Sequence, residues 1–266
     1  MPLRITMLGC GSSAGVPRVA QGWGACDPGN SKNRRRRCSI LVERVGPNGT
    51  TTVLVDTSPD LREQLLGANV RKIDGVLFTH DHADHSHGID DLRPLMLHQR
   101  RRVDVYLDAT TSAALHEKFA YCFATPEGSD YPPLVTEHRI VAGTPIEVAG
   151  EGGSVTAVPF LQHHGGGTTL GFRFGNFAYS CDVSSIPAES TVAIAGLDLW
   201  ILDSLRYKSH PSHFSVDEAL GWIERMKPRR AVLTNLHTDL DYETLRKSLP
   251  PNVEPGFDGL TLDLPD

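Results

Sequence analysis

Three imidazoles and two carboxylates stand within six residues, His80-Asp81-His82-Ala83-Asp84-His85, just after the apolar run 76–78. Neutral imidazole and carboxylate are the ligands that zinc binds in proteins, and manganese and iron accept them too. At the end of a strand, His80 and His82 can point to one side while Asp84 and His85 reach a second point nearby. A solvated polar turn would not need this density of ligands, so the stretch predicts a metal site.

Three further candidates, His164, Asp182 and His237, each follow a predicted strand. Strand ends at one edge of a sheet converge in space even when they are far apart in the sequence. These residues are therefore expected beside the histidine motif.

Seven candidate ligands are too many for one tetrahedral zinc and suit two ions. They are His80, His82, Asp84, His85, His164, Asp182 and His237. We expect His80, His82 and His164 to hold one ion, and Asp84, His85 and His237 the other. Asp182 is expected to bridge them, because a carboxylate can offer one oxygen to each ion. The predicted cofactor is two divalent ions per chain, with Zn²⁺ favoured and Mn²⁺ or Fe²⁺ left open.

The surrounding sequence predicts strands alternating with helices in one compact domain, residues 1–266. Predicted strands cover residues 4–8, 38–45, 51–55, 73–78, 103–107, 139–141, 146–148, 155–160, 170–174, 177–180, 197–202, 231–235 and 260–264. Predicted helices cover residues 59–66, 89–98, 112–123, 215–226 and 241–249. Ser58 is the expected N-cap of the first helix, and Ser215 with Glu218 forms a capping box for the fourth.

Several weaker candidates flank the predicted metal site. Asp56 ends a strand, where it could orient a metal-bound histidine or serve as a capping or surface carboxylate. The glycine-rich segment 9–17 follows the first strand, and its backbone N–H groups could line an anion site or only form a tight turn. Ser12, Ser13 and Tyr207 are weak candidates for substrate contact.

Composition limits the possible partners. The formal net charge of −6 does not favour nucleic acid as the main partner. Basic residues are nevertheless clustered at Lys32 with Arg34–Arg37, and again at Arg100–Arg102. The first cluster could recruit phosphate or be a solvated charge run, and the second is interpreted as a solvated run at an element boundary.

The cysteines and the apolar runs bear on location. The five cysteines are scattered, with no Cys-x-x-Cys pair, which indicates a reducing compartment and predicts a cytoplasmic protein. No apolar run reaches the roughly 20 residues that a membrane span needs, and the first residues do not resemble a signal peptide. A homodimer is the default expectation, because dimers are the commonest assembly.

The segment Thr79–His85, followed by a histidine, an aspartate and a histidine in that order, resembles the metallo-β-lactamase superfamily over nearly the whole chain. The segments Gly9–Pro17, Arg34–Ser39 and Gly256–Gly259 are similar to one branch of it. That branch contains phosphoribosyl cyclic phosphodiesterase (the PhnP-like proteins) and its relative ribonuclease Z. The resemblance implies a four-layer αβ/βα sandwich of the α/β class, with a dinuclear site that cleaves a phosphodiester through a metal-bridging hydroxide.

The resemblance also implies roles for individual residues. The seven candidates match its ligand pattern, with His164 preferred over His163 because its spacing to Leu170 fits the branch better. His213 falls at the place of a histidine that protonates the leaving group, a role suited to a side chain with a pKa of about 6.5. Asp84 gains the added role of orienting the hydroxide, and His210 is interpreted as a loop residue.

Two departures from the branch weaken the transfer of a specific substrate. Its cyclic phosphodiesterases hold a structural zinc with early cysteines and a late histidine, whereas this chain has only Cys26 in the early loop and Leu240 at the late position. This zinc is therefore not expected. The tRNA-gripping arm of ribonuclease Z is not recognisable either.

The predicted function is that of a metal-dependent hydrolase, most specifically a phosphodiesterase for a small cyclic phosphate or a nucleotide-like phosphodiester. The alternatives are a ribonuclease Z-like endonuclease, a hydrolase of a lactam, thioester or lactone, and a non-catalytic nucleic-acid-binding module. An intact set of metal ligands argues against the last of these.

Overall fold

The computed structural model describes residues 2–264, which form two seven-stranded sheets packed face to face. The first sheet has the order β14 (Thr261–Leu264), β1 (Leu3–Gly9), β2 (Ser39–Gly46), β3 (Gly49–Val55), β4 (Gly75–Leu77), β5 (Val103–Leu107) and β6 (Val135–Arg139). The second has the order β13 (Val253–Pro255), β12 (Arg230–Thr234), β11 (Leu199–Asp203), β10 (Phe177–Ser180), β9 (Gly167–Phe174), β8 (Val155–His164) and β7 (Ile146–Val148).

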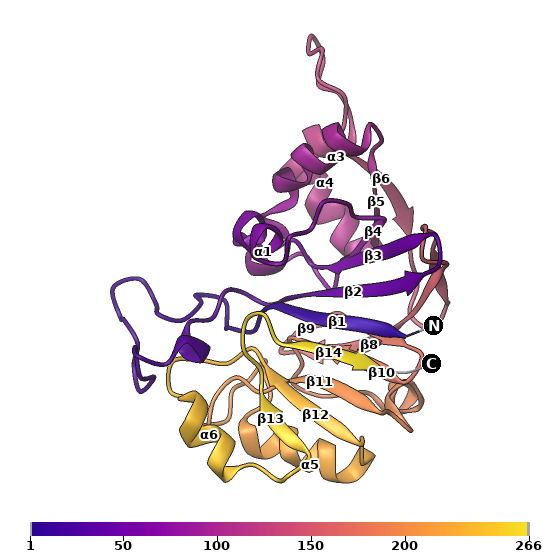
Figure 1. The fold of residues 1–266 in the computed structure, drawn as a ribbon. Helices are drawn as coiled ribbons and strands as arrows, with labels where there is room; N and C mark the ends of the chain where they lie inside the picture. Colours follow the sequence, from indigo (N-terminus) through magenta and orange to yellow (C-terminus); the bar gives the residue numbers. More distant parts are fainter. Residues whose placement is uncertain (1, 265–266) are drawn as a thin grey trace.

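Helices cover the outer faces of both sheets (Figure 1). Helices α1 (Leu61–Gly67), α3 (Arg93–Gln99) and α4 (Ala109–Phe123) lie on the first sheet, and α5 (Val216–Met226) and α6 (Tyr242–Ser248) lie on the second. The short elements are α2 (Ala83–Ser86) and the 3₁₀ turns η1 (Ser31–Asn33), η2 (Ile89–Leu92) and η3 (Ala188–Ile194). One apolar core, with Ile5, Val42, Phe172 and Ile201, lies between the sheets, and one lies under the helices on each side. The predicted four-layer αβ/βα sandwich is confirmed.

Each sheet is mixed, and its parallel strands point their carboxyl ends toward the loops that carry the histidines and aspartates. In the first sheet β3, β4, β5 and β6 pair in parallel, and in the second β10, β11, β12 and β13 do so. Strands β10 and β11 are buried at every position, because helices cover one face of the sheet and the other sheet covers the second. The site is therefore built where buried strands end.

Several predicted boundaries were wrong for local reasons. Helix α1 begins at Leu61 rather than residue 59, because the hydroxyl of Ser58 donates to the Gln64 side chain and accepts from the peptide N–H of Asp60, in a turn before the helix. The predicted helix 89–98 is split into η2 and α3, since Pro94 has no N–H for a continuous ladder.

Two further differences concern predicted strands. The predicted strand 139–141 is replaced by β6, which pairs in parallel with β5 and ends at Arg139. Strand β8 continues four residues beyond the predicted end and pairs with β9 as far as His164. His164 is therefore the last residue of a strand rather than part of the following loop.

The predicted capping box of α5 is present. Ser215 Oγ accepts from the peptide N–H of Glu218 at 3.3 Å, and the Glu218 carboxylate accepts from the peptide N–H of Ser215 at 2.8 Å. Ser215→Ala is expected to lower the free energy of unfolding by about 1 kcal/mol in urea titrations, because orphan N–H groups of the first turn lose their acceptor. Glu218→Gln keeps an oxygen that can accept from the Ser215 N–H, so it should lower the free energy of unfolding by less. Equal losses of unfolding free energy in the two variants would contradict the reciprocal capping roles of Ser215 and Glu218.

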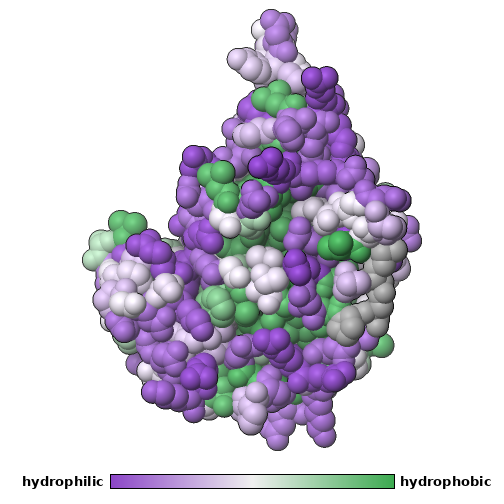
Figure 2. Space-filling model, viewed as in Figure 1, coloured by the Kyte–Doolittle hydropathy of each residue, from purple (hydrophilic) through white to green (hydrophobic). Residues whose placement is uncertain are grey.

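The face of the molecule seen in Figure 2 is mostly hydrophilic, with apolar residues in patches between charged ones. Within the described chain, the helices are too short or too polar to cross a bilayer.

Candidate metal centre

Four of the predicted ligands, contributed by three separate segments, meet in one cluster. His80 and His82 follow β4, His164 ends β8, and Asp182 follows β10. One ligand atom from each lies within 4.8 Å of the others. Their convergence follows from the strand ends that deliver them to one edge of the sandwich.

The distances within this cluster suit two ligands of a shared ion. The Nε2 atoms of His80 and His164 each lie 3.6 Å from Asp182 Oδ2. This is too long for a hydrogen bond but close to the roughly 3.3 Å that separates two ligands of a tetrahedral zinc with bonds of about 2.0–2.1 Å. His80 Nε2 is also buried and has no hydrogen-bond partner among residues 2–264. Burial lowers the pKa of both His80 and His164, which favours the neutral imidazole that binds metal. These residues fit a divalent cation.

Asp182 faces a second group of ligands with its other oxygen. His85 Nε2 lies 3.3 Å from Asp182 Oδ1 and 3.4 Å from Asp84 Oδ2. One oxygen of Asp182 therefore faces His80 and His164 while the other faces His85, as a carboxylate between two ions must. Burial disfavours the charged form of Asp182, but the neighbouring histidines, His85 foremost, hold its pKa well below the usual value.

Among the described residues, the groups of three or more ligand atoms that lie within 4.8 Å of one another do not include Asp84 or His237. The ring of His237 donates from Nδ1 to Asp239 at 2.7 Å, and its peptide N–H donates to Leu205. The coordination of a second ion by Asp84, His85 and His237 stays a prediction.

Five histidines share one arrangement, in which Nδ1 is hydrogen-bonded and Nε2 is left for another partner. The pairs are His80 with Thr79 Oγ1 (3.0 Å), His85 with Asp56 (2.7 Å), His164 with the Ser212 carbonyl (2.6 Å), His213 with Asp203 (2.8 Å) and His237 with Asp239 (2.7 Å). A bonded Nδ1 fixes the ring orientation and makes Nε2 the available nitrogen.

Asp56 orients His85, which was one of its two expected roles. It is fully buried, and its carboxylate accepts from His85 Nδ1 and from both the N–H and the hydroxyl of Thr79 at 2.8 Å. Burial raises the pKa of Asp56, although these hydrogen bonds oppose the rise. Asp56 therefore holds both ends of the Thr79–His85 motif.

Asp56→Asn is expected to weaken metal binding by about 10–100-fold, because His85 loses the charge that fixes its ring. The affinity can be measured by competition with a chromogenic chelator. Asp130→Asn, in an exposed loop, is the matched control. Equal affinities in the two variants would contradict the orienting role of Asp56.

His213 lies beside the first cluster and is held by a residue that sequence reasoning missed. Its ring centroid is 4.7 Å from that of His164, and it forms a third group of close ligand atoms with Asp182 and Asp203. Asp203 is fully buried at the end of β11 and also accepts from the peptide N–H of Val183. Its place at a strand end is the signal that could have identified it.

The pKa values of His213 and Asp203 are both raised, for different reasons. Burial lowers the pKa of His213, but the hydrogen bond to Asp203 and its charge outweigh burial and raise that pKa to about 8. Burial raises the pKa of Asp203 to about 6, against the effect of His213. The Asp203 carboxylate therefore favours a proton on the His213 imidazole.

Asn235 is a second residue that sequence reasoning missed. It adopts a positive φ of 63° directly after β12, and its buried amide donates to Asp182 Oδ1 at 2.9 Å. The same nitrogen lies 3.0 Å from His213 Nδ1. Asn235 thus fixes the carboxylate that faces both ligand groups.

The remaining candidates lie as follows. His163 exchanges main-chain hydrogen bonds with Ser184 and Ser185 and is outside the metal-ligand clusters of the described residues. Ser12 is buried, and its hydroxyl accepts from Arg18, whereas Ser13 and Tyr207 are exposed. The structure does not give Ser12, Ser13 or Tyr207 a role in substrate contact, so that role stays a prediction.

Residues 51–235 match the family described as the β-lactamase superfamily domain. The chain belongs to the metallo-β-lactamase superfamily. It is similar to a crystal structure described as a new diphosphatase from the PhnP family, with 36% identity, a TM-score of 0.89, and coverage of 99% of this chain and 98% of that one. Zn²⁺-bound PqqB from Methylobacterium extorquens shares the fold at 18% identity and a TM-score of 0.75, with 98% and 100% of the chains covered.

A curated octanoyltransferase of Porphyromonas gingivalis (strain ATCC BAA-308 / W83) is 33% identical over 263 residues. The match covers 97% of this chain but 51% of the relative. The chain therefore spans about half the length of that relative. The similarity to a PhnP-family structure agrees with the branch of the superfamily that the sequence predicted.

Proposed function

We propose that this metallo-β-lactamase superfamily member is a metal-dependent phosphodiesterase for a small cyclic phosphate or a nucleotide-like phosphodiester. The observation that carries the proposal is the position of His213, hydrogen-bonded to the buried Asp203 beside the metal-ligand cluster. The 36% identical PhnP-family diphosphatase supports chemistry at phosphorus.

The chain would hold two ions with the seven predicted ligands. When bound, divalent ions supply a nucleophile from water at neutral pH and neutralise phosphate oxygens. Asp182 presents one oxygen to each group of ligands, and Asp56 and Asn235 keep His85 and Asp182 in place. Asp84, whose Oδ2 lies 3.4 Å from His85 Nε2, would orient the attacking water.

His213 would act on the other side of the reaction. Its Nδ1 is bonded to Asp203, so Nε2 is the nitrogen that can give a proton to the leaving oxygen. A departing alkoxide needs this proton, whereas a thiolate leaving group does not. The His213–Asp203 pair therefore favours cleavage of a phosphate ester over cleavage of a thioester.

A second candidate is hydrolysis of an acyl group, which the similarity to an octanoyltransferase brings forward. The octanoyltransferase is a longer protein, of which this chain covers about half. Proton donation by the His213–Asp203 pair would not assist the departure of a thiolate from an acyl thioester. A ribonuclease Z-like activity is less favoured, because a net charge of −6 repels a polyanion.

The test is hydrolysis by metal-analysed protein of bis(p-nitrophenyl) phosphate, a 2′,3′-cyclic nucleotide, a ribosyl cyclic phosphate, a lactam and an octanoyl thioester. We expect two metal ions per chain and cleavage of the phosphate esters. His80→Ala should lose metal and activity together. Cleavage of the lactam or the thioester alone would reject the proposal and leave the superfamily assignment intact.

A further inference from the structure

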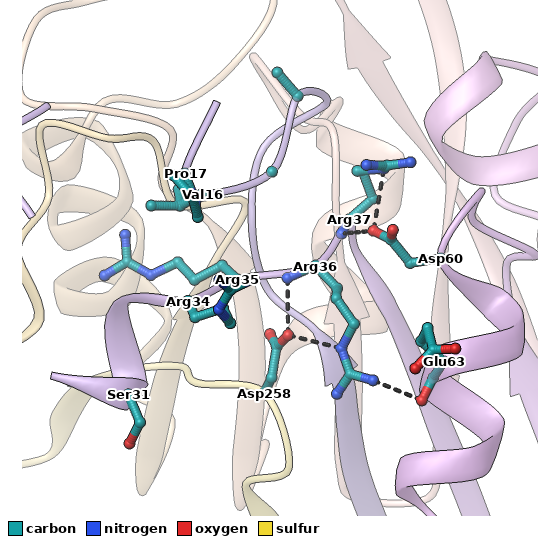
Figure 3. Close-up of a pocket in the computed structure, with 12 residues that line it drawn as sticks. Val16, Pro17, Ser31, Arg34, Arg35, Arg36, Arg37, Asp60, Glu63 and Asp258 are labelled. Atoms are coloured by element: carbon teal, nitrogen blue, oxygen red, sulfur yellow. Dashed lines mark hydrogen bonds and ion pairs between the residues drawn. The ribbon is translucent and has the colours of Figure 1, made fainter. Parts of the chain in front are cut away.

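Two open places on the molecule could receive part of a substrate. One is a hollow of about 560 Å³ beside the arginines at 34–37, and none of the seven predicted metal ligands is among the described residues that line it. In Figure 3, Arg36 lies beside Asp258 in this hollow, so its guanidinium already has a protein partner. The other place is the turn between β8 and β9, which begins directly after the candidate ligand His164. The turn therefore adjoins the candidate metal centre.

One face of β9 is turned toward the metal-ligand cluster. In the antiparallel pair of β8 and β9, Gly167 stands opposite His164, and Thr169 stands opposite Gln162. Alternate residues of a strand share a face, and directly opposite residues of a pair lie on the same face of the sheet. The hydroxyl of Thr169 donates to the carbonyl of Asp182 at 3.0 Å, so this face borders the cluster. Gly167 is the outermost position of β9 on that face.

Gly167 leaves the position beside His164 without a side chain. It is exposed, and within 4 Å a Cβ added to it would meet the His164 carbonyl oxygen alone, at 3.8 Å. Its φ is not positive, so the backbone does not require glycine at this position. Directly opposite Cβ atoms of an antiparallel pair lie about 4.5–5.5 Å apart, so a larger residue here would fill the space beside the His164 side chain. The glycine therefore keeps that space open.

The same turn packs against the segment that carries His213. Gly165 has a φ of 59°, and a Cβ added to it would lie 3.0 Å from Ser212 Cβ. The carbonyl of Ser212 accepts from His164 Nδ1 at 2.6 Å. The ring centroid of the next residue, His213, is 4.7 Å from that of His164. The glycine turn, a candidate metal ligand and the proposed acid therefore lie together around the open space at Gly167.

We propose that the open space at Gly167 receives the leaving alcohol of the substrate, and that the missing side chain admits an alcohol that carries a ring. The inference rests on the proposed function, in which His213 protonates the leaving oxygen. Proton transfer requires this oxygen within hydrogen-bond reach of His213, and the rest of the alcohol then extends from there along the turn. Three consecutive glycines, 165–167, present no side chain to it. Gly167 is thus a specificity-determining residue.

The first test compares two chromogenic diesters on metal-loaded protein, methyl p-nitrophenyl phosphate and methyl nitronaphthyl phosphate. Their leaving groups differ by one fused ring, and both leave as stabilised anions. Gly167→Val is expected to lower the ratio of kcat/KM, naphthyl over phenyl, about tenfold, because its methyl groups occupy the space of the second ring. Gly167→Ala should lower it less. The matched control is Gly221→Val in α5, an exposed position where an added Cβ meets no atom within 4 Å; it should not change the ratio.

A third substrate separates the leaving side from general crowding at the metal centre. In p-nitrophenyl naphthylmethyl phosphate, the naphthalene belongs to the group that stays on phosphorus. Gly167→Val should not change kcat/KM for this diester relative to methyl p-nitrophenyl phosphate, because the group that stays does not enter the space at Gly167. An equal loss with both naphthalene-bearing substrates, or a loss with neither, overturns the proposal.

Binding without turnover is measured with methyl naphthylmethylphosphonate, in which a carbon–phosphorus bond replaces the ester bond that would be cleaved. Its fluorescence reports binding to metal-loaded protein, and methyl methylphosphonate is measured by competition. Gly167→Val should weaken binding of the naphthalene ligand about tenfold and leave binding of the small ligand unchanged. If the wild-type protein cleaves no phosphate ester, the proposed function fails, and this titration decides on the subsite. Equal affinities of wild type and Gly167→Val for the naphthalene ligand then overturn the inference.

Discussion

His213→Gln is expected to lower kcat for a 2′,3′-cyclic nucleotide by about 10²–10⁴-fold while the protein keeps its metal. His213 is bonded to Asp203 through Nδ1 and lies beside His164 and Asp182, but it is not one of the seven predicted ligands. Its removal therefore takes away the proton for the leaving alkoxide without removing a ligand. Stopped assays of product, with metal content measured on the same samples, check both parts.

The choice of leaving group separates proton donation from other roles. p-Nitrophenolate leaves as a stable anion, so His213→Gln should lower the rate with bis(p-nitrophenyl) phosphate far less than with the cyclic nucleotide. Asp203→Asn should show the same dependence, because it acts through His213. His210→Gln is the matched control, with a ring centroid 5.2 Å from that of His213. Equal losses with both substrates would contradict the role of His213 as an acid.

The parts of the fold that sequence could predict are those with local signals. The apolar runs that became β4 and β10 are followed by polar residues where each strand ends, so the strands and the convergence of His80 and Asp182 could be predicted. The start of α1 could not be predicted, because the Ser58 hydroxyl bonds to the Gln64 side chain and to the Asp60 N–H in a turn before the helix.

The missed residues depend on contacts between distant segments. Asp203 ends a buried strand as the predicted ligands do, but its function becomes visible only when the loop carrying His213 folds back onto it. Asn235 likewise gains its role from Asp182, 53 positions earlier. A polar residue at the end of a buried strand can be predicted to lie at the site. The side chain that it contacts there cannot be predicted from its position in the sequence.

The arginine cluster shows the same limit. Sequence alone left phosphate recruitment and a solvated run open for residues 34–37, and the structure divides the cluster between the interior and the surface. Arg35 points into the protein, whereas Arg34, its neighbour, is exposed. Adjacent residues of an extended segment face opposite sides, so four consecutive arginines lie in different environments.

Arg35 is the buried cation that joins the early loop to the loop of His237. Its guanidinium donates to the Leu240 carbonyl at 2.6 Å and to the His237 carbonyl at 3.2 Å. On the other side it donates to the Asn33 side chain at 3.2 Å and lies 3.8 Å from Cys26 Sγ. Cys26 and Leu240 are the positions at which the family resemblance places ligands of a structural zinc. In this chain a guanidinium contacts both.

Arg35→Met is expected to lower the free energy of unfolding by about 3 kcal/mol, because the buried Leu240 carbonyl loses its side-chain donor and the His237 carbonyl keeps only the peptide N–H of Leu240. It should also loosen the loop that carries His237 and so weaken binding of the second metal ion. Urea unfolding followed by tryptophan emission, and metal content after dialysis, check the two effects. Arg35→Lys keeps the charge but not the fork of donors, so it should fall between wild type and Arg35→Met.

Arg34→Met is the matched control for this stability effect, since it removes the same side chain from the adjacent, exposed position. It should change the free energy of unfolding by less than about 0.5 kcal/mol. Similar losses in the two variants would mean that charge in the segment, rather than the buried contacts of Arg35, sets the stability. A stable Arg35→Met protein that binds one metal ion instead of two would show that the guanidinium acts mainly by positioning His237.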